Sequence, residues 1–201
     1  MSEVFDPTSP EWTPAEVEAA GPVLKKIRLT QVLGKPLPGA VFEGHLAGKK
    51  NISTEGVFFN ESGEVYLIKR PSPSENRSEP YPGMWHSPGV THGAFESNED
   101  AFGRLVRREL GDVEIVDQRG PFLGEGHDPP RARYELLITP TLIRGTPNAD
   151  ARGRFFKIPD IPWDQLVASH RQVILPLAIS ECFEYITDLL FNSAISKETV
   201  F

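Results

Sequence analysis

Residues 83–115 read GMWHSPGVTHGAFESNEDAFGRLVRRELGDVEI, which predicts a glycine-containing loop, a capped helix and a turn into a strand. Ser97 followed by Asp100 resembles a capping box, with aspartate in place of the usual Glu or Gln. Gly111 is typical of a helix end. One apolar face at helical spacing is formed by Ala101, Phe102, Leu105 and Val106. Glu109 comes next on that face, so we expect its carboxylate at the inward edge of the last turn.

A second stripe of the same helix is charged. Asp100, Arg104 and Arg108 follow one another at i, i+4 steps, an acid and then two bases. A loop, a helix and an inward carboxylate beside a row of arginines suit a diphosphate that is held through a divalent cation. The stretch therefore favours phosphate chemistry.

This stretch resembles the Nudix box, whose pattern is G-x5-E-x7-R-E-U-x-E-E-x-G-U with U an aliphatic residue. Counted without gaps from the first acid, the matching residues are Glu96, Arg104, Val106, Glu109 and Gly111. Leu105 and Arg108 stand where the family has two glutamates that carry magnesium in its hydrolytic members. Leucine offers no oxygen and arginine has the wrong charge, whereas magnesium needs near-octahedral oxygen ligands. We therefore do not expect the ordinary hydrolytic cluster.

A second resemblance is more specific. Residues 95–111 read FESNEDAFGRLVRRELG and are similar to the box of Nudix-fold isopentenyl-diphosphate isomerases, G-E-S-N-E-D-A-x-x-R-R-x-x-x-E-L-G. Residues 82–85 and 57–70 also resemble the segments that precede that box. The resemblance implies an α/β fold, the Nudix α/β/α sandwich with a mixed β-sheet. It also implies an organic diphosphate substrate and Mg²⁺ held by Glu109, with room for a second divalent metal.

The catalytic residues of those isomerases are matched only in part. Val90 stands in the place of the catalytic cysteine, and His92 matches the histidine close behind it. His45 matches one of two upstream metal histidines, and the other falls on Asn51. Glu135 matches the second carboxylate of a later E-x-E pair, whose first member is lost. Because valine cannot exchange a proton, an intact two-base isomerisation is not expected.

The candidate site combines this resemblance with charge. We expect Glu135, helped by His92, to transfer protons at the apolar end of the substrate. The residues expected to neutralise the phosphates are Lys69, Arg70, Arg77 and Arg104, with Trp85 as a wall for the organic part. The expected metal ligands are Glu109, His45, His86, His92 and Glu135.

The composition indicates one globular domain. The chain has 201 residues, 39% of them hydrophobic and 24% charged, which is enough for a full core. The formal net charge of −7 argues against a nucleic-acid binder. Cys182 is the only cysteine, so neither a disulfide nor a thiolate metal site is expected within the chain. The first residues do not resemble a signal peptide and no apolar run approaches ~20 residues, so we expect a cytoplasmic protein without a membrane span.

The pattern of residues predicts an N-terminal arm at residues 1–22 and a Nudix-like domain at residues 23–201. The expected strands are residues 24–32, 39–44, 54–60, 64–70, 113–118, 132–144 and 155–158, with a bend at Pro140. The expected helices are a short one capped by Thr13, one from Ile161 and a long apolar one at residues 173–191. Loops are expected at residues 71–82 and 120–130.

Three functions remain as alternatives. The first is a Nudix-fold enzyme with isomerase-like or elimination chemistry on an organic diphosphate, such as an isoprenoid diphosphate. The second is a divergent hydrolase of a nucleoside-diphosphate-type substrate, which would recruit carboxylates such as Glu99, Asp112, Glu114 or Glu125. The third is a non-catalytic or repurposed Nudix binding module, which Val90, Leu105 and Arg108 favour.

Overall fold

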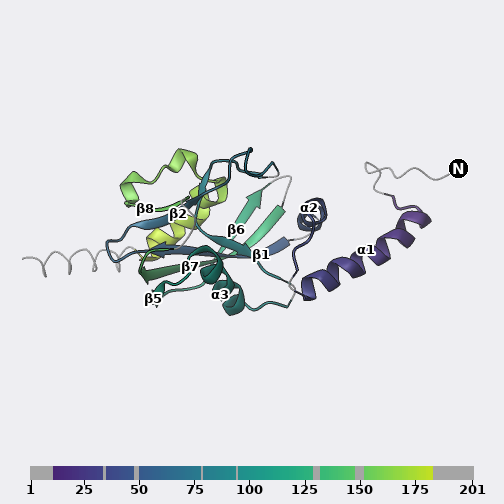
Figure 1. The fold of residues 1–201 in the computed structure, drawn as a ribbon, viewed down its shortest axis with the longest axis horizontal. Coiled ribbons are helices and arrows are strands. Elements are labelled where there is room, and N and C mark those ends of the chain that lie inside the picture. The colour runs from purple at the N-terminus through teal and green to yellow at the C-terminus, as the bar shows by residue number, and fades with distance from the viewer. Residues whose placement is uncertain are drawn as a thin grey trace, which may run out of the picture.

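The computed structural model describes residues 11–33, 35–47, 50–77, 79–93, 95–128, 132–147 and 152–182. Within them an eight-stranded sheet has the order β3-β2-β1-β7-β5, and β4 pairs with β1, β6 with β7 and β8 with β2 (Figure 1). The strands are β1 Lys50–Phe59, β2 Val65–Lys69, β3 Trp85–His86, β4 Gly89–Thr91, β5 Glu114–Gln118, β6 Phe122–Asp128, β7 Ala132–Arg144 and β8 Gly153–Phe156. The helices are α1 Pro14–Val32, α2 Gly39–Ala47 and α3 Asn98–Glu109, followed by 3-10 turns at Ile158–Asp160 and Trp163–Gln165 and a π-helical turn at His170–Ile174.

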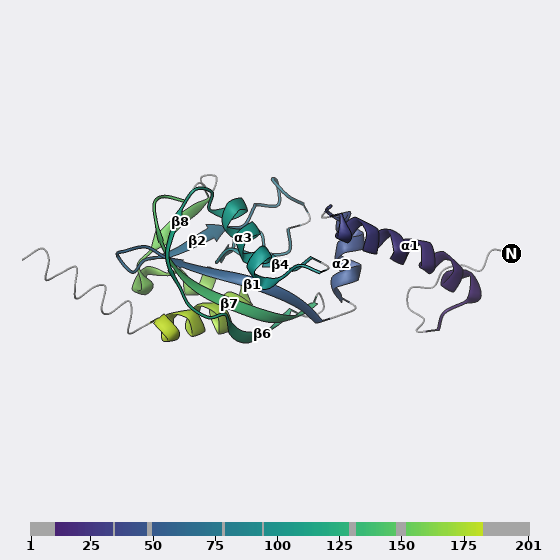
Figure 2. The same cartoon turned by 90° about the horizontal axis from the view of Figure 1, so that it is seen from below.

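The sheet is mixed, because β1 and β7 run parallel whereas their other neighbours are antiparallel. Side chains alternate across a strand, so Val57 and Phe58 of β1 belong to two separate core clusters. Helix α3 packs on the Phe58 side, and the helical segment at residues 170–182 packs on the Val57 side (Figure 2). We call these sides the α3 face and the opposite face. The predicted α/β/α sandwich with a mixed sheet is confirmed.

Helix α3 forms where the sequence predicts it. Ser97 Oγ accepts a hydrogen bond from the Asp100 N–H at 3.1 Å, which satisfies a free donor of the first turn. Gly111 follows the helix with a φ of 73°, the left-handed conformation that commonly ends helices. The predicted apolar face is buried, namely Ala101, Phe102, Leu105 and Val106. Burying each large side chain contributes roughly 1.5–3 kcal/mol, so this face anchors the helix on the sheet.

The strands predicted at residues 54–60 and 64–70 correspond to β1 and β2, which form a hairpin. Strands β1 and β2 are antiparallel, and the Asn60 side chain closes the turn between them. Its Oδ1 accepts hydrogen bonds from the N–H groups of Ser62 and Glu64. The strands predicted at residues 113–118 and 132–144 correspond to β5 and β7, and the one at 155–158 corresponds to β8 with earlier bounds.

Pro140 lies inside strand β7 and not at a bend. Its carbonyl accepts a hydrogen bond from the Arg119 N–H at 2.9 Å, so its missing N–H faces the same edge. Along that edge β6 pairs with β7 as far as Ile138, and β5 pairs with it from Thr141 onward. Proline is tolerated here because the ladder is already interrupted.

Two predicted strands are wrong, because residues 24–32 belong to α1 and residues 39–44 belong to α2. Thr13 forms a full capping box with Glu16, and the helix continues through Pro22 to Val32. No residue of α1, all of which is described, is buried. Residues 24–32 form a strand-like pattern, but no neighbouring strand pairs with them, so local helix preference decides the outcome.

The predicted loop at residues 120–130 contains strand β6. The glycines of β6 allow neighbouring side chains to pack closely against the strand. A Cβ on Gly124 would press on Val173 and Ile138, and one on Gly126 would press on Leu136. The helix expected from Ile161 is only the 3-10 turn at Trp163–Gln165. The helix predicted at residues 173–191 starts earlier, through the π-helical turn, and residues 183–191 lie outside the described part.

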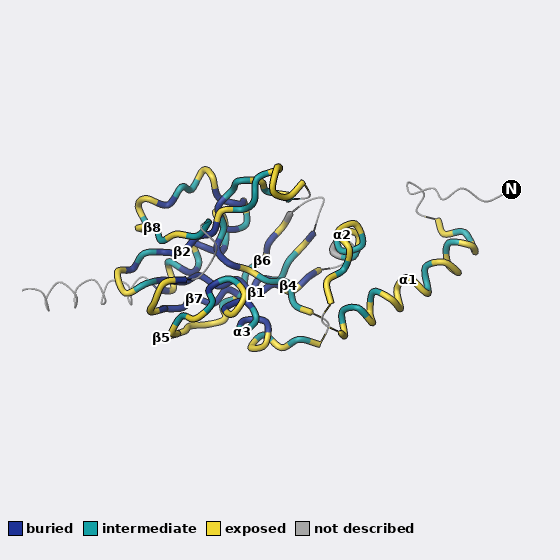
Figure 3. The backbone as a smooth tube through the Cα atoms, in the orientation of Figure 1, coloured by how far each residue is buried: buried dark blue, intermediate teal, exposed yellow. Residues whose placement is uncertain are grey.

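Helix α1 extends away from the sheet, and its residues are exposed or half-buried along its length (Figure 3). It crosses the expected boundary between residues 22 and 23, and the division into arm and domain stays a prediction. None of the described helices is long and apolar enough to cross a membrane.

Candidate functional site

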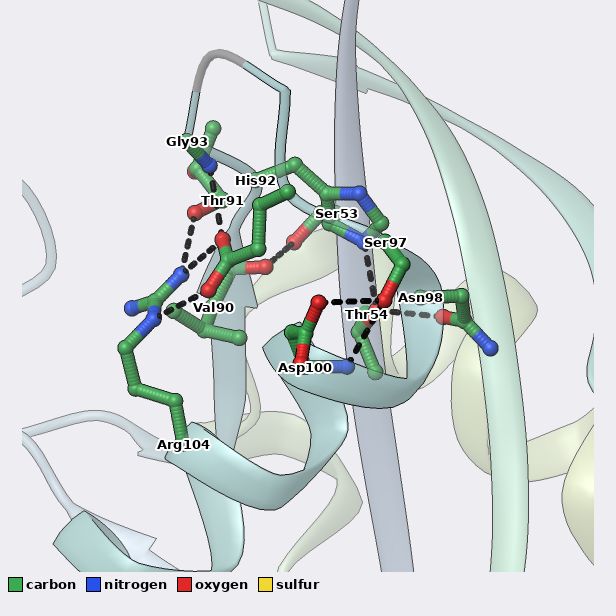
Figure 4. A network of polar contacts seen from close by, with 11 residues as sticks. Ser53, Thr54, Val90, Thr91, His92, Gly93, Ser97, Asn98, Asp100 and Arg104 are labelled. Atoms are coloured by element: carbon green, nitrogen blue, oxygen red, sulfur yellow. Dashed lines mark hydrogen bonds and ion pairs between the residues drawn. The ribbon is translucent and has the colours of Figure 1, made fainter. Parts of the chain in front are cut away.

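A closed ion pair ties α3 to the loop before it (Figure 4). Arg104 donates from Nε and Nη2 to the two oxygens of Glu96 at 2.7 and 2.6 Å, and from Nη2 to the Thr91 carbonyl at 3.1 Å. Glu96 also accepts the Gly93 N–H at 2.8 Å. Arg104 is the main reason that the pKa of Glu96 lies below its ordinary value. Both side chains therefore brace the loop, and the phosphate role of Arg104 stays a prediction.

His92 is part of the same α3 face. Thr54 donates its hydroxyl proton to Asn98 Oδ1 at 2.8 Å, so its oxygen accepts from His92 Nε2 at 2.7 Å. Burial lowers the pKa of His92, which keeps the ring neutral at physiological pH. The side chain joins β1 to the start of α3, and its predicted catalytic and metal roles stay predictions.

The remaining predicted ligands on this side lie apart. Each has another partner: Glu109 lies 3.3 Å from Arg108, Glu135 lies 3.3 Å from Lys50, and His45 lies 3.1 Å from Gln31. Among the residues that the structure describes, no three His, Cys, Asp or Glu side chains are placed to share an ion. Leu105 is buried in the core and has no oxygen to offer. These residues do not fit the magnesium cluster of hydrolytic Nudix enzymes.

A pocket of about 140 Å³ involves the other side of β1. Ser53 and Glu55 alternate with Thr54 along the strand, so they point away from the face that carries His92. Polar side chains that join them in the lining are Arg70, Tyr81, His86, Thr91, His127, Tyr134, Ser169 and His170. We call this the Glu55 pocket. It is formed where segments from β1, β3, β4, β6, β7 and the π-helical turn meet.

Glu55 is a carboxylate buried within the sheet, with 7% of the residue exposed. Its Oε1 accepts from Ser53 Oγ at 2.7 Å, and its Oε2 has no hydrogen-bond partner in the described part of the chain. Gly89 lies opposite it in β4, where a Cβ would collide with the carboxylate. Burial raises the pKa of Glu55 from 4.5 to about 7, against smaller lowering effects of Ser53 and Arg70.

Arg70 supplies the positive charge of the Glu55 pocket. Its guanidinium lies 3.4 Å from Glu79 and 5.9 Å from the centre of the Tyr81 ring. Its Nε is buried without a hydrogen-bond partner among the described residues. Planar guanidinium donors match phosphate oxygens. The Arg70 side chain is 30% exposed, so part of its guanidinium can meet an anion although Nε itself is shielded.

Two of the three histidines that line the pocket, His86 and His170, are buried and neutral. Burial, followed by the charge of Arg70, lowers the pKa of His170 to about 3 and that of His86 well below its ordinary value. His170 Nδ1 accepts the Ser87 N–H at 3.3 Å, and His86 Nδ1 donates to the Ser87 carbonyl at 2.7 Å. Their ring centroids are 5.6 Å apart. The pocket thus offers two fixed, uncharged imidazoles beside one cation.

The structure brings together only two of the predicted site residues in this lining, Arg70 and His86. Lys69 Nζ lies 5.6 Å from the centre of the Trp85 ring, which packs in the core. Arg77 lies exposed in the loop after β2. The substrate roles of Lys69, Trp85 and Arg77 stay predictions.

The sequence analysis missed Glu55 and His170. For Glu55 the available signal was an acid in the middle of a strand, two residues before an apolar run. For His170 there was no local signal, because it meets Ser87 across 83 residues of chain. Tertiary contacts alone create this part of the site.

Comparison with solved structures identifies the fold. A MutT protein from Methanosarcina mazei Go1 has a TM-score of 0.53 and 18% identity, covering 66% of this chain and 94% of that one. A Nudix hydrolase from Nitrosomonas europaea has a TM-score of 0.52 and 17% identity, over 68% and 90%. A MutT Nudix hydrolase from Burkholderia pseudomallei has a TM-score of 0.50 and 20% identity, over 66% and 97%.

The chain therefore has the Nudix fold, as the sequence predicts. At these identities the likeness concerns the fold alone. No family model and no curated protein matches the sequence. Substrate and reaction must be argued from the chain's own side chains.

Proposed function

We propose that this chain is a Nudix-fold enzyme that binds a small organic phosphate or diphosphate in the Glu55 pocket. The observation that carries the proposal is the combination of Arg70, with its unpartnered buried Nε, and the buried acid Glu55 in one cavity. A cation that binds an anion beside an acid with a pKa near neutrality is typical of an active site.

The electrostatics of the pocket support an anionic ligand. His86 and His170 are uncharged near neutral pH, and Arg70 lies 3.4 Å from Glu79. Below pH 7 Glu55 is mainly protonated, so it does not repel an anion. A charge-assisted hydrogen bond from Arg70 to a phosphate contributes roughly 1.5–3 kcal/mol.

The helix α3 acids are not used for binding in this proposal. Both carboxylate oxygens of Glu96 accept hydrogen bonds from Arg104. Leu105 and Arg108 stand at the two positions where the Nudix box has glutamates, so those carboxylates are missing. Isomerase-like chemistry on an isoprenoid diphosphate is one outcome within the proposed class. The resemblance of residues 95–111 to the isomerase box supports it, and the loss of a thiol at Val90 opposes it.

A second candidate is hydrolysis of a nucleoside-diphosphate-type substrate, which the description of the structural neighbours as Nudix hydrolases favours. Two of the carboxylates that it would recruit are engaged in ion pairs. Glu114 pairs with Arg144 at 3.0 Å, and Glu125 pairs with Lys50 at 2.9 Å. These exposed pairs are weak, so product analysis must decide between the two chemistries.

The test is isothermal titration calorimetry with inorganic diphosphate, a nucleoside diphosphate, isopentenyl diphosphate and dimethylallyl diphosphate. We expect binding of at least one of them, and Arg70→Gln should weaken it roughly tenfold or more, because a charged donor is lost. The matched control is Arg107→Gln, since Arg107 lies exposed on α3, and it should leave affinity unchanged.

Product analysis then follows for every diphosphate that binds. Phosphate release indicates hydrolysis, whereas a shifted double bond without phosphate release indicates isomerisation. Binding without any product would reduce the proposal to a binding module. Failure of all four compounds to bind, or equal binding by Arg70→Gln, would refute the pocket as a phosphate site.

A further inference from the structure

Glu55 lacks the partners that a buried carboxylate normally has. An ionised carboxylate can accept about four hydrogen bonds, yet in the described residues Glu55 receives one, from Ser53. No described cation lies within ion-pair distance of it, and the nearest charge that acts on it, Arg70, is paired with Glu79. A buried acid with an unsatisfied oxygen costs stability, so its position requires a functional explanation.

Oε2 of Glu55 packs against Gly89, in the space that a Cβ would occupy, and is itself shielded from solvent. The carboxylate forms part of the wall of the cavity. Ser53 Oγ lies 2.7 Å from Oε1 and 3.1 Å from the Val90 carbonyl, and its one hydroxyl proton is shared between these two acceptors, which fixes the orientation of the carboxyl group. Oε2 is therefore the carboxylate oxygen that has no partner among the described residues, and its carboxyl group lies in the wall of the pocket.

We propose that Glu55 binds the anionic ligand of this pocket in its protonated form, with the Oε2–H group donating a hydrogen bond to a phosphate oxygen. This inference rests on the proposed function, and it adds that binding is linked to proton uptake. When the ligand binds to ionised Glu55, one proton passes from solvent to Oε2, and no other bond is made or broken. The ligand class is an organic phosphate or diphosphate whose phosphate group lies against Glu55 and Arg70.

The direction of the linkage follows from charge. An anion beside Glu55 favours the neutral carboxyl group and raises its pKa above the value of about 7 in the free protein. Above pH 7 the free protein must therefore take up a proton in order to bind. The affinity of the wild-type protein should fall as pH rises, approaching tenfold per pH unit.

Replacing Glu55 by glutamine separates this effect from the other titrating groups. Glutamine has nearly the same shape and is neutral at every pH, so Glu55→Gln mimics the protonated acid. The charged and titratable groups that face the pocket and remain the same in both proteins are Arg70, His86, His127, His170, Tyr81 and Tyr134. Comparing the two proteins also cancels the titration of the probe itself.

The experiment is calorimetric titration of inorganic diphosphate into wild-type protein and Glu55→Gln at pH 6.0 and pH 8.5. Each titration is repeated in buffers of different ionisation enthalpy, so that the protons taken up are counted. We expect similar affinities at pH 6.0, and roughly tenfold or more tighter binding by the variant at pH 8.5. The wild-type protein should take up close to one more proton than the variant at pH 8.5. Glu181→Gln, which replaces an exposed acid, should behave as wild type.

Each outcome decides something different. Binding that depends on Arg70, with the same pH dependence in wild type and Glu55→Gln, overturns the role of Glu55 and leaves the proposed function standing. Absence of inorganic diphosphate binding at both pH values overturns the role of Glu55, and the proposed function is overturned as well if the three organic diphosphates also fail to bind. Proton counting on the wild-type protein needs no variant, so misfolding of Glu55→Gln would not prevent the test: no proton uptake at pH 8.5 overturns the role of Glu55.

Discussion

Replacing Glu55 by glutamine should make the protein more stable at neutral and alkaline pH, in contrast to most changes of a buried residue. The unfolded chain ionises Glu55 near 4.5, whereas the folded protein keeps the proton until about pH 7, because burial penalises the carboxylate. A group whose pKa is raised by folding lowers stability as pH rises between these two values. The loss is present in full above pH 7.

The magnitude follows from the two pKa values. The interval from 4.5 to about 7, at about 1.4 kcal/mol per pH unit, corresponds to ~3 kcal/mol. Glutamine does not titrate, so Glu55→Gln escapes this loss. The free energy of unfolding of the variant, minus that of wild type, should therefore rise by ~3 kcal/mol between pH 4.5 and pH 8.

The assay is urea unfolding of both proteins at several pH values in that range. The neighbouring histidines are present in both, so their titration cancels in the difference. Glu181→Gln serves as the control and should show a difference that does not change with pH, because that residue is exposed. A constant difference between wild type and Glu55→Gln would show that Glu55 is ionised like an exposed acid, and the argument from burial would be wrong.

Three further predictions concern neighbouring residues. His170→Asn should flatten the loss of stability below pH 6.5, since folding lowers the pKa of His170 to about 3 and wild type loses ~1.4 kcal/mol per pH unit there; unchanged acid unfolding would contradict this. Gly89→Ala should destabilise by roughly 1–3 kcal/mol through collision with Glu55, and a double-mutant cycle with Glu55→Ala should recover part of it. Glu96→Gln should cost about 1 kcal/mol by opening the pair with Arg104, without changing diphosphate affinity; a tenfold loss of affinity would move the site to α3.

The parts of the fold that the sequence predicts are those with strong local signals. Helix α3 has a cap, an apolar stripe and a terminal glycine within one short segment, and all three act as expected. The β1–β2 hairpin has its turn residues between two apolar runs. In both cases neighbours along the chain determine the structure.

The predictions that are wrong concern segments whose structure depends on residues far away along the chain. Whether residues 24–32 form a strand depends on a neighbouring strand, and none pairs with them. Glycines such as Gly124 suggest a loop, but in β6 they allow close packing against Val173 and Ile138. No local pattern distinguishes these two uses of glycine.

In the candidate site, too, the residues that local sequence patterns indicate differ from those that only tertiary contacts bring together. The resemblance directs attention to α3 and to His92 and Glu135, which the structure places on the α3 face or at its edge. The pocket with Glu55 and His170 forms where β1 meets the π-helical turn, and only tertiary structure brings those elements together. Because side chains alternate along β1, Thr54 and Glu55 point to opposite faces of the sheet. Thr54 hydrogen-bonds to His92 on the α3 face, whereas Glu55 accepts a hydrogen bond from Ser53 on the pocket side.

The most direct test of the central claim is a crystal structure of the protein grown with Mn²⁺ and inorganic diphosphate, with anomalous data collected at the manganese edge. We predict diphosphate density within hydrogen-bond distance of Arg70 and Glu55, and no manganese peak at Glu96 or Glu109. Diphosphate bound through manganese at Glu109 on helix α3, with the Glu55 pocket unchanged, would contradict the account.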